Sequence, residues 1–167
     1  SFGPAYAIAW TVSGFFPADD IALYYRFAEL MQDSCQQLDM LGIWYNKMED
    51  YMVEEYANKP KLTILKSLEP WMSSEERIVA NPWTKFLKGK KVLVIHPFAE
   101  TIQKQYKNRD RLFEGTEILP EFELLTLKAV QTLAGEKDNR FDTWFDAWDW
   151  MTNRALEMDF DIALIGC

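Results

Sequence analysis

The only histidine of the chain, His96, follows a continuous apolar run, KVLVI, and precedes Pro97 and Phe98. An imidazole at this junction can donate a hydrogen bond to a phosphate oxygen or a sugar hydroxyl. The helix expected after Pro97 would add free backbone N–H groups and the positive end of its dipole, both of which attract anions. We therefore predict an anion-binding site here, although a lone histidine also serves simply as a helix cap.

A cluster of basic residues follows His96: Lys104, Lys107, Arg109 and Arg111. Lys104 stands about two helical turns beyond His96 and is the member best able to reach back to it. For the other three, the solvated outer face of a helix is the favoured interpretation, because most helix charges lie on the surface.

Three further residues are weaker candidates. Glu69, in LEPW, can bind a ribose hydroxyl or act as a base, but an ordinary loop carboxylate is the favoured interpretation. Trp44 and Trp71 can stack on a base or a sugar ring, yet large aromatic residues more often pack in the core or at its rim. The aromatic run over residues 141–150 is interpreted as helix packing.

Short apolar runs alternate with amphipathic stretches along the chain. Strands are predicted over residues 39–44, 61–65, 91–95, 122–130 and 161–166, and helices over residues 17–38, 46–57, 81–87 and 141–155. Apolar strands separated by helices are typical of a parallel sheet covered on both faces. The prediction is therefore an α/β, three-layer, Rossmann-like domain with a mostly parallel sheet. In such a sheet ligands bind beyond the carboxyl ends of the strands, so Trp44, Glu69, His96 and Gly166 are expected on one common edge.

Composition excludes several classes of protein. The 167 residues suit a single domain, and a hydrophobic fraction of 49% excludes disorder. No apolar run approaches the ~20 residues of a membrane-spanning helix. A net charge of −8 disfavours nucleic acid as a partner. The two cysteines, Cys35 and Cys167, lack CxxC spacing, which favours a reducing compartment such as the cytoplasm.

The two ends of the sequence suggest a piece of a longer domain. The chain starts at Ser1 without a methionine and stops in an apparent buried strand, DIALIGC. A natural domain rarely ends there, because the strand lacks the crossover that normally follows it. We therefore expect residues 1–167 to be one incomplete domain, truncated at both ends.

The run NPWTKFLKGKKVLVIHPFAETIQKQYKNRDRLF, followed by LPEFELLTLKAVQTLAGE and FDIALIGC, resembles bacterial GT-D-type glycosyltransferase domains. The likeness covers most of the chain from Asp39 onward and is most specific in VLVIHPF, LPEFEL and IALIGC. These domains are associated with surface-polysaccharide and glycoprotein assembly. The resemblance implies a Rossmann-like fold, a nucleotide-sugar donor and transfer of a hexose to a hydroxyl of a glycan or glycoconjugate acceptor.

The resemblance also implies roles for the candidates. His96 and Lys104 would stabilise the departing nucleoside diphosphate, Glu69 would deprotonate the acceptor, and Trp44, Pro97, Phe98 and Gly166 would help to bind the donor. The family's acidic motif, Asp-x-Glu, binds a divalent metal such as Mn or Mg, but no Asp-x-Glu occurs in this sequence.

Two alternatives stay open. One is a Rossmann-like enzyme that uses a dinucleotide or S-adenosylmethionine, which predicts a Gly-rich loop after the first strand. No GxGxxG, Walker A, HExxH or GxSxG motif is present. The other is a non-catalytic module that binds a nucleotide or a sugar within a larger assembly.

Overall fold

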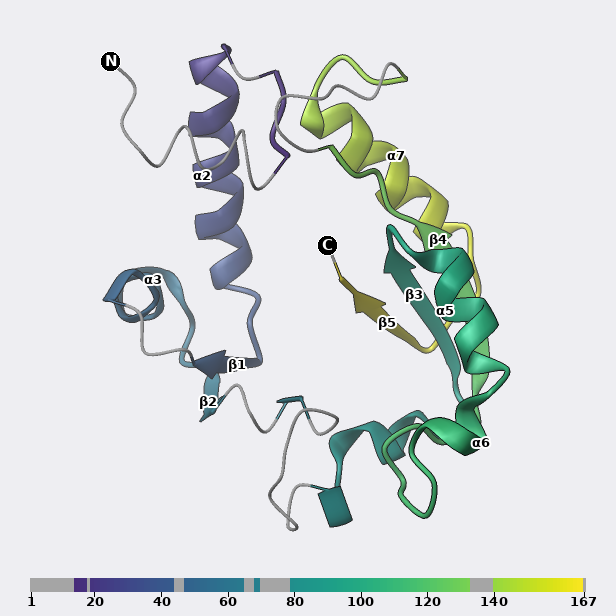
Figure 1. Cartoon of the computed structure of the whole chain (residues 1–167). Coiled ribbons are helices and arrows are strands. Elements are labelled where there is room, and N and C mark those ends of the chain that lie inside the picture. Colours follow the sequence, from purple (N-terminus) through teal and green to yellow (C-terminus); the bar gives the residue numbers. More distant parts are fainter. Residues whose placement is uncertain are drawn as a thin grey trace. The chain divides into compact units, whose positions relative to one another are not determined.

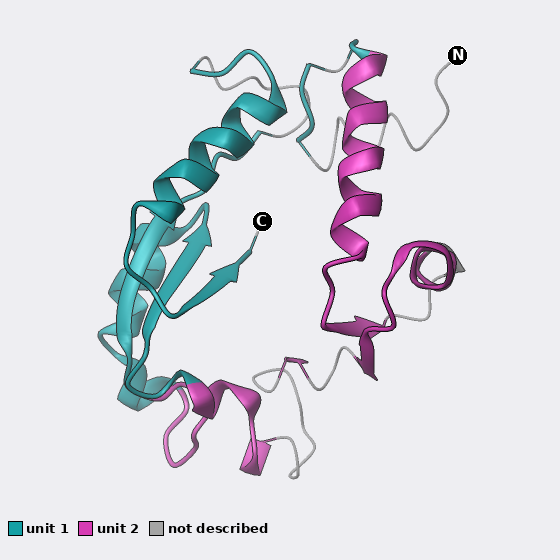
Figure 2. Cartoon of the chain, turned by 180° about the vertical axis from the view of Figure 1, so that it is seen from behind, with its two compact units in different colours: residues 1–20, 87–112, 121–167 teal, residues 21–86, 113–120 magenta. Residues whose placement is uncertain are grey.

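The structure, a computed structural model, describes residues 14–17, 19–43, 47–64, 68–69, 79–132 and 140–166 (Figure 1). The chain divides into two compact units (Figure 2). Unit 1 consists of Ser1–Asp20, Leu87–Leu112 and Glu121–Cys167, and unit 2 of Ile21–Phe86 and Phe113–Pro120. Trp44 and Trp71 lie outside the described residues.

Unit 1 contains a sheet of three parallel strands in the order β4-β3-β5. The strands are β3 (Lys91–His96), β4 (Glu123–Lys128) and β5 (Ile162–Ile165). The helices of this unit are α5 (Ala99–Tyr106), α6 (Arg109–Leu112) and α7 (Trp144–Leu156). His96 lies opposite Lys128 in the register of β3 and β4, and Ile95 lies opposite Ile165 on the other side.

One face of this sheet packs against α7. Leu93 and Ile95 form a buried core with Ala155 of the helix, and Leu125 and Leu127 of β4 pack against the same core. Side chains alternate along a strand, so these residues share one face. The segment before α7 fixes where the helix begins. Thr143 and Asp146 form a capping box there, in which each side chain satisfies a backbone N–H group of the first turn.

The opposite face of the sheet is covered by α5 (Figures 1 and 2). Gln103 Nε2 donates to Thr126 Oγ1, and Thr126 alternates with the strand residues that face α7. The Tyr106 hydroxyl donates to the Phe122 carbonyl (2.8 Å) and accepts from the Phe122 N–H group (2.7 Å). Helix α5 is thus attached to β4 and to Phe122, the residue before this strand. The three layers of unit 1 are α5, the sheet and α7.

Replacing Tyr106 with phenylalanine is expected to lower the free energy of unfolding by about 1–3 kcal/mol, because both backbone groups of Phe122 lose their partner. Burial raises the pKa of the Tyr106 phenol above 10.0. This contribution is therefore complete below pH 10 and is lost as the pH rises through the folded pKa. Urea unfolding at neutral and alkaline pH checks both statements. Tyr25→Phe, at an exposed phenol, is the control and should change little.

Unit 2 contains a second, two-stranded parallel sheet. Its elements are α2 (Ile21–Cys35), β1 (Met40–Ile43), α3 (Lys47–Tyr56) and β2 (Lys61–Ile64), and the 3₁₀ helix η3 (Trp83–Leu87) runs from this unit into unit 1. Strands β1 and β2 pair from Met40 opposite Lys61 to Ile43 opposite Ile64. Trp83 Nε1 donates to the Leu68 carbonyl at 2.9 Å, which ties the loop after β2 to the start of η3.

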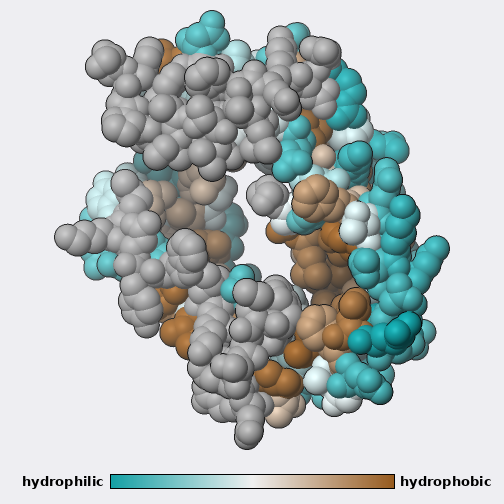
Figure 3. Space-filling model, in the orientation of Figure 1, coloured by the Kyte–Doolittle hydropathy of each residue, from teal (hydrophilic) through white to brown (hydrophobic). Residues whose placement is uncertain are grey.

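The predicted fold class is confirmed: this is an α/β protein with parallel strands and a Rossmann-like arrangement. The detail differs, because the strands form two sheets, one in each unit, and not the single sheet that was predicted. Apolar side chains gather over β3 and β5, whereas hydrophilic ones cover the outer side of α5 (Figure 3). Among the described helices, none is both long and apolar enough to cross a membrane.

Candidate functional site

The connections in unit 1 create a crevice at the carboxyl edge of its sheet. The chain leaves β3 towards α5 on one face and leaves β4 towards α7 on the other. Strands β3 and β4 are neighbours, and the helices that follow them lie on opposite faces, so the connections switch sides between the ends of these strands. A crevice of this kind, at a switch in strand order, is where open α/β sheets bind their ligands.

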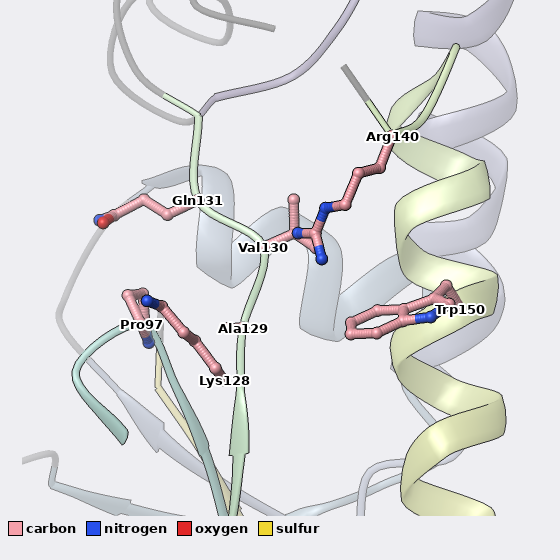
Figure 4. A pocket seen from close by; sticks show the side chains of 7 residues that line it. All are labelled: Pro97, Lys128, Ala129, Val130, Gln131, Arg140 and Trp150. Atoms are coloured by element: carbon pink, nitrogen blue, oxygen red, sulfur yellow. The ribbon is translucent and has the colours of Figure 1, made fainter. Parts of the chain in front are cut away.

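A pocket of about 390 Å³ lies at this crevice (Figure 4). It is lined by Pro97 after β3, Lys128 and residues 129–131 at the end of β4, and Arg140 and Trp150 on the α7 side. The backbone here is held in place: the Ala129 N–H group donates to the His96 carbonyl (3.2 Å), and the Val130 N–H group donates to Met151 Sδ (3.3 Å). The strand ends and α7 are therefore connected directly beneath the pocket.

Arg140 is stacked on aromatic rings. Its guanidinium carbon lies 5.1 Å from the centroid of the Phe141 ring and 5.3 Å from that of Trp150. Figure 4 shows the side chain reaching over Val130 towards Trp150. A guanidinium held against aromatic rings loses little of its ability to donate, because its N–H groups can still recognise a phosphate or a carboxylate. Arg140 is thus oriented before any ligand binds.

The charge of the pocket is unusual for an acidic chain. Lys128 and Arg140 are both cationic, and none of the described residues that line the pocket is acidic. The amino edge of the same sheet differs. There Lys91 forms an ion pair with Asp159, which raises the pKa of Lys91, and its backbone N–H group donates to the Asp161 carboxylate. Lys91 is therefore neutralised by aspartates, whereas the described lining of the pocket includes two cationic side chains.

The junction at His96 lies beside the pocket. The Phe98 N–H group donates to His96 Nδ1 at 3.0 Å, and the two rings lie 5.4 Å apart, tilted by 45°. Gly166 follows β5, and its N–H group donates to the Ile95 carbonyl at 3.0 Å. A Cβ atom at Gly166 would lie only 2.7 Å from Cδ2 of His96. The structure thus brings His96, Phe98 and Gly166 together on the edge where they were predicted.

Of the other predicted site residues, one lines the pocket and the rest are not among its described lining residues. Pro97 lines the pocket, but Lys104 is an exposed residue in the last turn of α5 and does not. Helix α5 begins at Ala99, and Phe98, its N-cap residue, makes no side-chain cap. Glu69 is a half-buried residue of the loop after β2, in unit 2. Trp44 belongs to a part of the chain that the structure does not describe.

Sequence reasoning did not identify Lys128, Arg140 or Trp150 as site residues. The predicted strand ran to residue 130 and so placed Lys128 inside it, whereas β4 ends at Lys128 in the structure and puts this residue at the same edge as His96. Trp150 was assigned to packing, and its half-buried ring does lie against Phe141 at a centroid distance of 5.7 Å. It also forms one wall of the pocket. Arg140 directly precedes this aromatic run, a spacing that favours stacking.

The divalent metal implied by the resemblance finds no ligands in the described residues, which contain no group of three or more His, Cys, Asp or Glu side chains that could hold one. No family model, curated protein or solved structure matches the chain. The resemblance to GT-D-type domains therefore stays a prediction.

Proposed function

We propose that this protein is a glycosyltransferase that transfers a hexose from a nucleotide-sugar donor to an acceptor hydroxyl in surface-polysaccharide or glycoprotein assembly, in the cytoplasm. The observation that supports this function is the pocket at the diverging ends of β3 and β4, with Lys128, Arg140 and Trp150 in its wall. Two cations suit the diphosphate of the donor, and an indole face suits its base or sugar ring.

The chemistry of the transfer needs such a site. When the sugar leaves, negative charge develops on the nucleoside diphosphate, and pre-oriented cations stabilise this charge more strongly than water does. Arg140, held against two aromatic rings, and Lys128, at the end of β4, would supply this stabilisation. If the sugar inverts, a base must take the proton of the acceptor hydroxyl. No step is assigned to a metal ion.

A non-catalytic nucleotide-binding module is the second candidate function. One observation favours it: none of the described side chains in the wall of the pocket is a carboxylate or an imidazole, so these residues offer an anion positive charge but no base. Hydrolysis or transfer of a nucleotide sugar would exclude this alternative. Binding without turnover, under every combination of donor, acceptor and metal, would support it.

Calorimetric titration of the protein with UDP, and with UDP- and GDP-hexoses, tests the proposed function. Lys128→Ala and Arg140→Ala are each expected to weaken UDP binding about ten- to a hundredfold, the range for a charge-assisted hydrogen bond. The matched control is Arg154→Ala. This arginine is on α7 but pairs with Glu157 (2.7 Å) and does not line the pocket, so its loss changes the net charge equally without changing affinity. Equal weakening by all three variants would mean that the anion is held by overall charge alone.

A further inference from the structure

The imidazole of His96 has a defined proton arrangement. A backbone N–H group can only donate to a nitrogen that carries a lone pair, and the Phe98 N–H group donates to His96 Nδ1 at 3.0 Å. A neutral imidazole has a single ring proton, so this proton lies on Nε2. Within the described part of the chain, no hydrogen bond from Nε2 to a protein acceptor is found.

Gly166 sets the position of this ring. A Cβ atom at residue 166 would lie 2.7 Å from His96 Cδ2 and 3.4 Å from His96 Nε2. Nothing larger than hydrogen fits at the first distance, and the imidazole is not the far end of a long, flexible chain that can move aside. The Cδ2–Nε2 edge of the ring therefore lies against the glycine at the end of β5, on the carboxyl edge of the sheet.

We propose that His96 binds the ligand as a hydrogen-bond donor, through Nε2–H to a ligand oxygen, and that Gly166 is the residue that positions it. This inference rests on the proposed donor site, because it supplies a third polar group beside Lys128 and Arg140. His96 cannot at the same time act as a base through Nε2, since that nitrogen already carries the proton. The Phe98 N–H group keeps the proton there.

Nitrogen-15 NMR of the full chain, labelled at histidine, tests the positioning directly. The chain has one histidine, so one imidazole gives all the signals. At a pH where the ring is neutral, the wild-type protein is expected to show a single tautomer, with Nε2 protonated and Nδ1 not. Gly166→Ala should return the ring to the mixture of tautomers seen in a solvated histidine. A mixture in the wild-type protein, or a proton on Nδ1, would overturn the inference.

Two substitutions distinguish the role of His96 Nε2 as a donor from the role of Nδ1 as an acceptor. In His96→Asn the side-chain oxygen can take the place of Nδ1 and accept from the Phe98 N–H group, as in an Asx turn, but no donor remains at the position of Nε2. His96→Gln places an N–H group close to that position. Titration with UDP should show a loss of about tenfold or more for His96→Asn and a change below about threefold for His96→Gln. Equal affinity of His96→Asn and wild type would refute the role as donor.

The steric role of Gly166 in positioning the His96 ring has a separate control. Gly166→Ala should lower Tm, and it should lower Tm less in a His96→Ala background, because the clashing ring is then absent. If the two decreases are equal, Gly166 does not act through His96. If the wild-type protein shows the single Nε2–H tautomer but does not bind UDP, the proposed function fails, whereas the positioning of His96 by Gly166 stands.

Discussion

Replacing Gly14 with alanine is expected to lower the free energy of unfolding by about 2–5 kcal/mol, the sum of backbone strain and steric overlap. Gly14 has φ of +67°, a conformation that L side chains adopt at a cost of about 1–2 kcal/mol. A Cβ atom there would lie 2.0 Å from the Thr132 carbonyl oxygen, which is backbone and cannot rotate away. The Thr132 hydroxyl also donates to the Gly14 carbonyl at 2.6 Å, and this contact would be displaced.

Gly89 provides a matched control for the two contributions. Its φ of +71° is nearly the same, but no atom lies within 4 Å of a Cβ atom built on it. Gly89→Ala therefore measures backbone strain alone, and the difference between the two variants measures the overlap with Thr132. Urea unfolding of both proteins gives this difference. Equal losses of stability would show that Gly14 does not press against Thr132.

The same contact connects the amino-terminal segment to the pocket. Thr132 directly follows residues 129–131, which line the pocket, and the neighbouring Phe15 ring stacks on Trp144 at the start of α7 with a centroid distance of 5.7 Å. The Trp144 N–H group also donates to the Phe16 carbonyl at 2.8 Å. Residues 14–16 thus join the end of β4 to the beginning of α7, the two segments from which Lys128, Arg140 and Trp150 arise.

Local patterns were sufficient to predict most of the elements. Lys91–His96 is a strand because its apolar residues form an unbroken run in which most are β-branched, and Trp144–Leu156 is a helix because its apolar residues recur at helical spacing. Both patterns are properties of neighbouring residues, so a single sequence reveals them. The pairing of Gly14 with Thr132 is different, since 118 positions separate the two residues. No local sequence pattern at either residue indicates that the other is its partner.

The candidate site was predicted only in part, because it also depends on which distant segments of the chain lie side by side. His96 was identified because it ends a strand, and Lys128 ends the adjacent strand in register with it. That register depends on which strands are neighbours, and the sequence does not state this. Lys104 was favoured by its separation from His96 along a helix. A helix that connects two parallel strands must return towards their amino ends, however, so a residue in the last turn of α5 lies away from the carboxyl edge.

Leu93→Ala is expected to lower the free energy of unfolding by about 2–5 kcal/mol, the range for a large-to-small change that leaves a cavity in a core. Leu93 has no exposed surface and lies in the central strand of the sheet, between β4 and β5 and against Ala155 of α7. Its neighbours belong to a sheet and a helix that are held by hydrogen bonds, so they cannot collapse into the space that its side chain leaves.

Leu156→Ala is the matched control, because it makes the same chemical change at a side chain that is 73% exposed, at the end of α7. It should alter the free energy of unfolding by less than about 0.5 kcal/mol, as surface substitutions usually do. The two variants therefore separate burial from the identity of the residue. If Leu93→Ala cost no more than Leu156→Ala in urea unfolding, α7 would not cover this face of the sheet. The pocket wall formed by Arg140 and Trp150 would then have no fixed place beside β4.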